Sequence, residues 1–187
     1  MEDTMLWART PEECHLYMSL HPCACGEDRF EWHQHYVIPG EERISVYEGP
    51  CPRCAATREF RFAIPDTLAP PFSFGGDQLS RIIDPAQFLQ RFQRAVRIVP
   101  PDPALVNGSQ RARCCAELRM GLAALREVLK FIPPGEAAVP ADAFTSDVGR
   151  AAYRRQPDQF GRQRLESQLA SHEKTLTAYV ESVSRPA

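Results

Sequence analysis

Four cysteines in two close pairs constrain this chain more than any other feature of its sequence. The first pair is Cys23-Ala-Cys25, followed by Gly26, and the second is Cys51-Pro-Arg-Cys54. A tetrahedral metal ion is enclosed when two tight turns each present two thiolates to it. The two pairs therefore predict that the first third of the chain closes around one zinc ion, held by Cys23, Cys25, Cys51 and Cys54.

The rest of the chain favours zinc over disulfide bonds at these pairs. Seven cysteines are an odd number, so a fully paired disulfide framework is impossible. The first nine residues are acidic and lack the apolar core of a signal peptide. No apolar run is long enough to span a membrane. We therefore expect a cytoplasmic protein, in which thiols stay reduced and close cysteine pairs bind metal.

Three segments around the cysteine pairs alternate between apolar and polar residues with the period of two that is typical of strands. These segments are 29–38, 43–48 and 59–64, and Pro39-Gly40 predicts a turn between the first two. The predicted apolar positions are Phe30, Trp32, Tyr36, Ile38, Ile44, Val46, Phe60, Phe62 and Ile64. His33 and His35 then fall on the opposite, polar face.

Cys-Pro-x-Cys between two strands is a zinc-knuckle signature, and the first 66 residues resemble a zinc ribbon over about 45 of them. The resemblance is to a widespread architecture and implies a three-stranded antiparallel sheet with a structural zinc site, but no single activity. Two features depart from the pattern. One residue rather than two separates the first cysteines, which leaves His21 open as a ligand in place of Cys23. Ala55 also replaces the glycine that commonly follows the second pair.

Helical patterns surround this ribbon. Thr10-Pro-Glu-Glu13 is a capping box that predicts a short leading helix ending before Pro22. Residues 65–77 read as a linker or packed loop, and Asp84-Pro85 then starts a helix. Two leucine seams follow, from Cys115 to Ile132 and from about Arg162 onward, and predict an antiparallel pair. The chain is thus predicted to be α+β, with a ribbon domain over 1–66 and a helical domain over 67–187.

Two candidate surfaces remain for a partner. One is the polar face of the ribbon around His33, His35 and Tyr47, and the other is the arginine-bearing helix around Arg91 and Arg94. Either group also has an ordinary explanation as solvated side chains. Basic residues are almost all arginine, which together with abundant Ala and Pro indicates a bacterial genome of high GC content.

Charge and motifs narrow the function to a class. Residues 1–66 carry 12 acidic and 6 basic residues, whereas residues 67–131 carry 5 acidic and 9 basic. An acidic ribbon would repel phosphates, which disfavours DNA reading. No nucleotide-binding or nucleophile motif is present. We expect a non-catalytic zinc protein that binds another protein, such as an adaptor, a chaperone-like protein or an immunity-type partner. The alternatives are a nucleic-acid-binding regulator using the arginines of 81–126, and an enzyme with an open zinc site.

Overall fold

The structure is a computed structural model that describes residues 5–40, 43–66 and 69–184. The described residues form two compact units that divide between Ile83 and Asp84, and each unit is described by itself. None of the helices in the described ranges combines the length and the apolar character needed to cross a bilayer.

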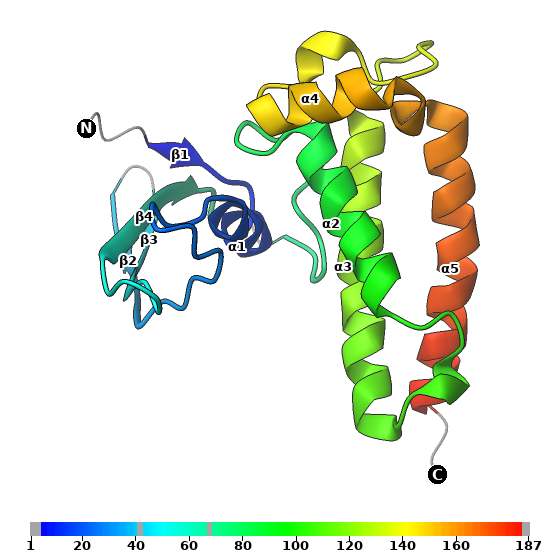
Figure 1. The fold of residues 1–187 in the computed structure, drawn as a ribbon, viewed down its shortest axis with the longest axis horizontal. Coiled ribbons are helices and arrows are strands. Elements are labelled where there is room, and N and C mark those ends of the chain that lie inside the picture. The colour runs from blue at the N-terminus through cyan, green and yellow to red at the C-terminus, as the bar shows by residue number, and fades with distance from the viewer. Residues whose placement is uncertain (1–4, 41–42, 67–68, 185–187) are drawn as a thin grey trace. The chain divides into compact units, whose positions relative to one another are not determined.

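The first unit is built on a sheet in which four strands are described, in the order β1-β4-β3-β2 (Figure 1). The strands are β1 (Leu6–Trp7), β2 (Gln34–Ile38), β3 (Arg43–Pro50) and β4 (Thr57–Ile64). β3 and β4 are the two inner strands, and β3 pairs antiparallel with both β2 and β4. β1 runs parallel to β4, with Leu6 opposite Phe62 and Trp7 opposite Ala63.

The α+β class is confirmed, but the prediction of a three-stranded antiparallel ribbon is wrong. The sheet is mixed, because β1 adds a parallel strand beside β4. A strand of two residues is too short to show an alternating pattern, so β1 could not be predicted from the sequence. The first predicted strand is also shorter than expected, since β2 begins only at Gln34.

Helix α1 (Pro11–Leu20) covers one face of this sheet. Thr10 caps it as predicted, because its side chain accepts a hydrogen bond from the backbone N–H of Glu13 at 3.1 Å. Cys14 and Met18 are buried in one cluster with Tyr47 and Phe62 of the sheet. The strand register explains why Tyr47 and Phe62 share the face beneath α1. Tyr47 of β3 lies opposite Phe60 of β4, and Phe62 lies two positions further along β4, on the same face as Phe60.

The second unit is a helical bundle. Its α-helices are α2 (Pro85–Ile98), α3 (Gly108–Lys130), α4 (Asp147–Arg155) and α5 (Arg162–Ser184). Short 3-10 turns lie at η1 (Pro103–Leu105), η2 (Ala141–Ala143) and η3 (Pro157–Phe160). α3 runs antiparallel to α2 and to α5 and packs against both, and α4 lies across one end of the bundle (Figure 1).

The leucine seams form the core of this bundle, as their spacing indicates. Leu122, Leu125 and Leu165 are fully buried, as are Phe88 and Phe92 of α2. Helices α2 and α3 approach closely at Gly121. A Cβ built on Gly121 would lie 2.6 Å from the Cβ of Ala95, so only glycine fits this crossing without a shift.

Candidate metal centre

The four cysteines of the two predicted pairs come together at one point. Their sulfur atoms all lie within 4.8 Å of one another. The Sγ atoms of Cys23 and Cys54 are 3.6 Å apart, and so are those of Cys25 and Cys51. Four sulfurs at the corners of a tetrahedron around zinc, with bonds of about 2.3 Å, are separated by about 3.8 Å. The cluster therefore has the dimensions of a metal site.

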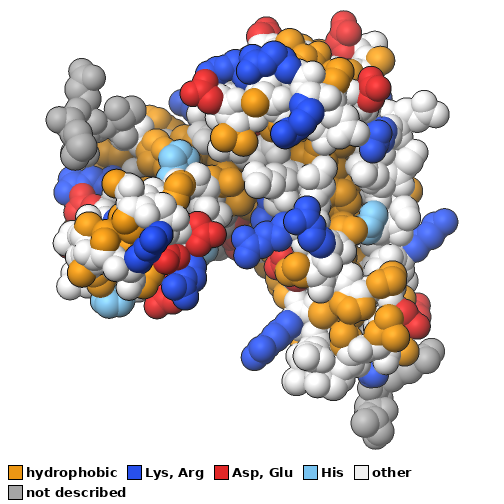
Figure 2. Space-filling view, viewed as in Figure 1, with side chains coloured by type: hydrophobic (Ala, Val, Ile, Leu, Met, Phe, Trp, Pro, Cys, Tyr) orange, Lys and Arg blue, Asp and Glu red, His pale blue; other side chains and the backbone are white. Residues whose placement is uncertain are grey.

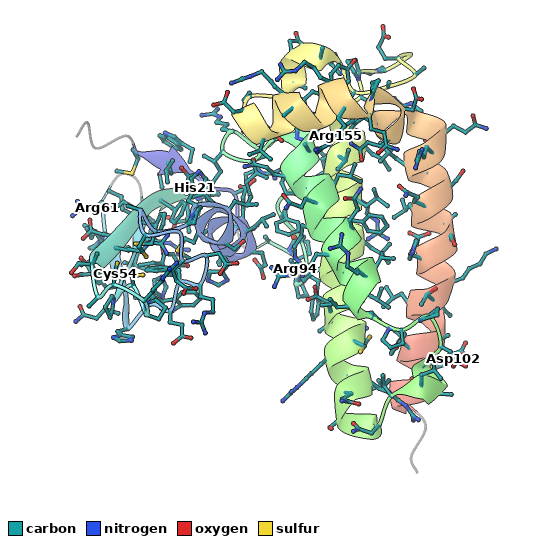
Figure 3. The ribbon with its side chains drawn as sticks, in the orientation of Figure 1. His21, Cys54, Arg61, Arg94, Asp102 and Arg155 are labelled. Atoms are coloured by element: carbon teal, nitrogen blue, oxygen red, sulfur yellow. The ribbon has the colours of Figure 1, made fainter. Side chains whose placement is uncertain are left out.

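Disulfide bonding does not account for this approach. All seven cysteines, each of them within the described residues, are free thiols. A disulfide would place two sulfurs at about 2.05 Å. Cys23 and Cys51 are buried, whereas Cys54 is exposed at the surface of the unit (Figure 3). The cluster is thus partly covered and lies within reach of an ion from solvent.

The second pair lies in the turn that joins β3 to β4. The N–H of Cys51 donates to the carbonyl of Ala56, and the N–H of Ala55 donates to the carbonyl of Cys51, both at 2.9 Å. Ala55 adopts a left-handed backbone conformation with a φ of 59°. This is the position where the sequence carries alanine in place of the common glycine, so the turn keeps the glycine geometry with a residue that is strained in it.

The first pair repeats this turn with one residue fewer. The N–H of Cys23 donates to the carbonyl of Glu27, and the N–H of Gly26 donates to the carbonyl of Cys23 at 2.7 Å. Gly26 has a φ of 85°, which favours glycine. Both turns therefore close on the first cysteine of their pair and end in a left-handed residue. The unusual single-residue spacing of Cys23 and Cys25 still brings both sulfurs into the cluster.

Hydrogen bonds within the cluster shift the pKa values of the Cys51 and Cys54 thiols in opposite directions. Burial opposes ionisation of Cys51, but the N–H groups of Cys54 and Arg53 and two neighbouring thiols lower the pKa of Cys51 to about 6. The N–H of Ala56 acts to lower the pKa of Cys54, whereas the other three thiols raise it to about 12. One thiolate forms readily and discourages the next. A cation is what would let all four lose their protons.

Two arginines position the turns, and neither role was anticipated from the sequence. Arg53, inside the second pair, donates from Nη1 to the carbonyl of Cys25 at 3.1 Å and so joins the two turns. Arg58 of β4 donates from Nη2 to the carbonyl of His21, which precedes the first turn. The Arg58 guanidinium lies 4.8 Å from the ring centroid of Phe30 and 5.2 Å from that of Phe60. Their positive charges favour an anionic tetrathiolate centre.

His21, the alternative ligand, lies outside the cluster of four sulfurs. Its Nδ1 is 2.7 Å from the carbonyl oxygen of Tyr17, one helical turn earlier. Its ring also stacks on that of Tyr17, with the centroids 3.8 Å apart. This histidine is thus held against the end of α1. Cys23, and not His21, belongs to the cluster of candidate metal ligands.

The predicted polar face around His33, His35 and Tyr47 is not arranged as expected. Tyr47 is only 2% exposed and belongs to the core beneath α1. His35 lies opposite Tyr47 in the register, stacks on its ring at 4.3 Å, and is 2.7 Å from the Ser45 hydroxyl through Nε2. His33 is exposed and precedes β2. All five residues of the edge strand β2 are exposed, including His35 and the apolar side chains of Tyr36 and Ile38.

The two predicted arginines on α2 differ in their surroundings. Arg91 forms a bidentate ion pair with Glu117 of α3, at 2.6 and 2.9 Å, and so joins two helices of the bundle. Arg94 is exposed (Figure 3). On the visible face of this unit, basic side chains gather over α2 and α4 (Figure 2). Arg94 is therefore the more available of the two for a partner.

Comparisons with known proteins found no relative of this chain. No protein-family model matches the sequence, and neither the curated proteins nor the solved structures contain a match. The functional argument therefore rests on the residues and their geometry.

Proposed function

We propose that this protein is a non-catalytic zinc-binding protein that acts by binding another protein. The observation that supports the metal is the cluster itself, whose 3.6 Å sulfur separations fit the edges of a zinc tetrathiolate. Four cysteine ligands fill the coordination sphere of zinc and leave no position for water or substrate. A centre of this kind stabilises the surrounding turns and does not carry out a reaction.

Zinc is favoured over other metals by the donor set. Thiolates are soft ligands, and four of them in a tetrahedral arrangement select zinc or an iron–sulfur centre. The two knuckle turns and their N–H···S hydrogen bonds to Cys51 are consistent with a compact, closed structural site. In such a site metal binding and local folding are the same event.

Metal content measures the first half of the proposal. Protein purified without added metal should contain one zinc per chain, and Co²⁺ exchanged into it should give the absorption bands of a tetrahedral tetrathiolate. Cys54→Ser should reduce the zinc content, whereas the matched variant Cys114→Ser, on α3 and outside the cluster, should keep it. Less than half an equivalent of zinc in the wild-type protein, or iron in its place, would overturn the zinc assignment.

Binding to a protein partner is the second half of the proposal. Its support is the distribution of charge, with an acidic zinc-bearing segment and exposed arginines such as Arg94 on the helical unit. Arg91 is engaged by Glu117 and Arg126 by Glu173, which leaves less positive charge for a phosphate backbone. The charge pattern therefore fits a protein surface better than duplex DNA.

Charge reversal separates a protein partner from a nucleic acid. Arg94→Glu should release a protein that co-purifies with the wild-type chain in fixed stoichiometry, whereas Lys174→Glu on α5 serves as the control. Duplex DNA should show no sub-micromolar binding at physiological salt. If wild-type protein binds a defined DNA site with steep salt dependence and Arg94→Glu abolishes it, the regulator alternative is correct.

A further inference from the structure

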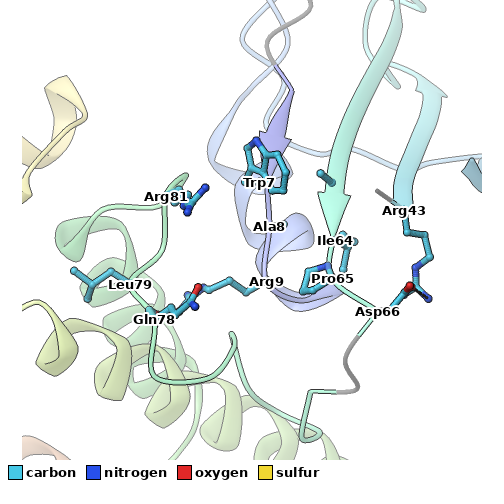
Figure 4. Close-up of a pocket in the computed structure, with 11 residues that line it drawn as sticks. Trp7, Ala8, Arg9, Arg43, Ile64, Pro65, Asp66, Gln78, Leu79 and Arg81 are labelled. Atoms are coloured by element: carbon cyan, nitrogen blue, oxygen red, sulfur yellow. Dashed lines mark hydrogen bonds and ion pairs between the residues drawn. The ribbon is translucent and has the colours of Figure 1, made fainter. Parts of the chain in front are cut away.

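A cavity of about 300 Å³ opens in the first unit where β1 and β4 end (Figure 4). Trp7 and Ile64, the last residues of these two strands, contribute apolar surface, and Leu79 adds to it from the loop that follows the sheet. None of the four clustered cysteines is among the described residues that line it. The cavity is therefore a second candidate site, independent of the metal centre.

The loop wall of this cavity is fixed before any ligand arrives. Arg9 donates from Nη1 to the carbonyl of Gln78, and its guanidinium is paired with the fully buried carboxylate of Glu13 at 2.7 Å. A Cβ on Gly75 would lie 2.8 Å from the Cβ of Arg9, so the loop passes directly over this side chain. Phe74 is buried beside it. Because these contacts hold the loop to the start of α1, binding carries little ordering cost.

The chemistry of the lining is apolar and cationic together. Among the described residues three arginines border the cavity, Arg9, Arg43 and Arg81, against one carboxylate, that of Asp66. Arg43 pairs with Asp66 at 3.2 Å, but both side chains are well exposed, so this contact is weak and can exchange for a ligand. The Arg81 guanidinium lies 5.9 Å from the centroid of the Trp7 ring. Figure 4 shows Arg81 and Arg43 on opposite sides of the cavity.

We propose that this cavity binds a small organic anion, with a flat apolar group against Trp7 and Leu79 and a carboxylate or phosphate facing Arg43 or Arg81. Guanidinium groups present paired donors that match both kinds of anion. The volume lies at the lower end of the range for small-molecule sites, about 300–1,000 Å³, so the ligand is compact, of the size of one ring with a short acidic arm.

Trp7 lines the cavity, so its fluorescence can report ligand binding. The chain has two tryptophans, and Trp32→Phe leaves Trp7 as the sole indole. Titration of this variant with 3-phenylpropionate and with phenyl phosphate should change the Trp7 fluorescence saturably, with a Kd below about 1 mM for at least one of them. The better of the two identifies the acidic group. The neutral 3-phenylpropionamide should bind at least about tenfold more weakly, a difference of about 1.4 kcal/mol.

Charge variants test the arginines directly. Arg43→Gln or Arg81→Gln should weaken the better anion at least threefold, whereas Arg29→Gln, an exposed arginine of the same unit paired with Glu27, should leave it unchanged. If Trp32→Phe does not fold, the indole N–H of Trp7 in the wild-type protein provides the same titration by NMR. Equal affinity for acid and amide, indifference to both arginine variants, or no saturable change with either anion at 10 mM would overturn the proposal.

Discussion

The carboxylate of Asp84 joins the starts of two helices through Ser146. Its Oδ1 accepts the N–H groups of Ala86 and Gln87, which caps α2, and its Oδ2 accepts the N–H and the hydroxyl of Ser146 at 3.0 and 2.5 Å. The Ser146 oxygen in turn accepts the N–H of Gly149 and caps α4. Asp84 is 2% exposed, so one buried side chain orders both helix starts.

Replacing Asp84 should therefore cost more than an ordinary cap. Asp84→Ala removes the α2 cap and leaves the donors of Ser146 unpaired, and we expect a loss of about 2–4 kcal/mol in the free energy of unfolding. Asp102→Ala, which removes the exposed cap of η1, should cost under about 1 kcal/mol. Urea titration followed by circular dichroism measures both. Equal losses would mean that the link to Ser146 contributes nothing.

The left-handed residue of the second cysteine turn should accept glycine. Ala55 has a φ of 59°, which costs a non-glycine residue about 1–2 kcal/mol. Ala55→Gly removes most of this strain and should raise the stability of the metal-loaded protein by about 1 kcal/mol, after the extra entropy of glycine in the unfolded chain is subtracted. The neighbouring Ala56→Gly provides the control and should be neutral or destabilising. Thermal unfolding distinguishes the two variants, and a loss of stability in Ala55→Gly would contradict the turn geometry.

The crossing of α2 and α3 predicts a paired effect. Gly121→Ala places a methyl group against Ala95 and should destabilise the bundle by about 1–3 kcal/mol. Ala95→Gly in the same chain makes room for it, so the double variant should be more stable than the sum of the single changes. A double-mutant cycle from denaturant unfolding measures this coupling. Strict additivity would show that the two residues do not meet.

The first unit should lose stability in mild acid partly through His15. Burial lowers the pKa of His15 from 6.5, Glu12 opposes this, and His35 lowers it further. The unfolded chain then binds the proton more readily, so the contribution of His15 is complete above pH 6.5 and is lost as the pH falls through the lower folded value. His15 stacks on Trp32 at 4.8 Å, so Trp32→Ala should raise the pKa of His15 toward 6.5. NMR titration measures this shift, and Trp7→Ala should not reproduce it.

Metal removal should act on the two units unequally. A chelator strong enough to strip the cysteine cluster should unfold the first unit, because four thiols without a cation cannot all ionise and the two turns lose their common centre. The helical signal in circular dichroism should largely remain, since α2, α3 and α5 form their own core. Hydrogen exchange resolved along the chain separates the units. Loss of protection in α3 together with β3 would contradict their independence.

Local signals in the sequence were sufficient for much of this fold. The turn at each cysteine pair, the Thr10 cap and the Asp84-Pro85 helix start each form within a few residues, and the structure contains all of them. The leucine seams likewise follow from the helical period of about 3.6 residues, which does not depend on what the helix packs against. The meeting of the two cysteine turns joins more distant residues, and it was expected only because four thiols suit one metal ion.

The features that were missed depend on contacts across the chain. β1 is two residues long and is recognisable only by its partner β4. His35 was assigned to the polar face together with Tyr47, but it is Tyr47 that is buried beneath α1, whereas His35 stacks on its ring and remains exposed. The roles of Arg58 and Ser146 depend on partners 37 and 62 positions away in the sequence. No periodicity or short motif records such pairs.

The parallel pairing of β1 with β4 also governs the order in which the first unit can assemble during synthesis. Leu6 emerges from the ribosome long before Phe62, its partner in the register. A nascent chain that has just exposed Cys54 already holds all four clustered cysteines, yet β4 begins only at Thr57, so β1 has no partner strand. Metal capture can therefore precede closure of the sheet. The last step of assembly is then the pairing of β1, which is synthesised first, with β4, which is synthesised last among the four strands.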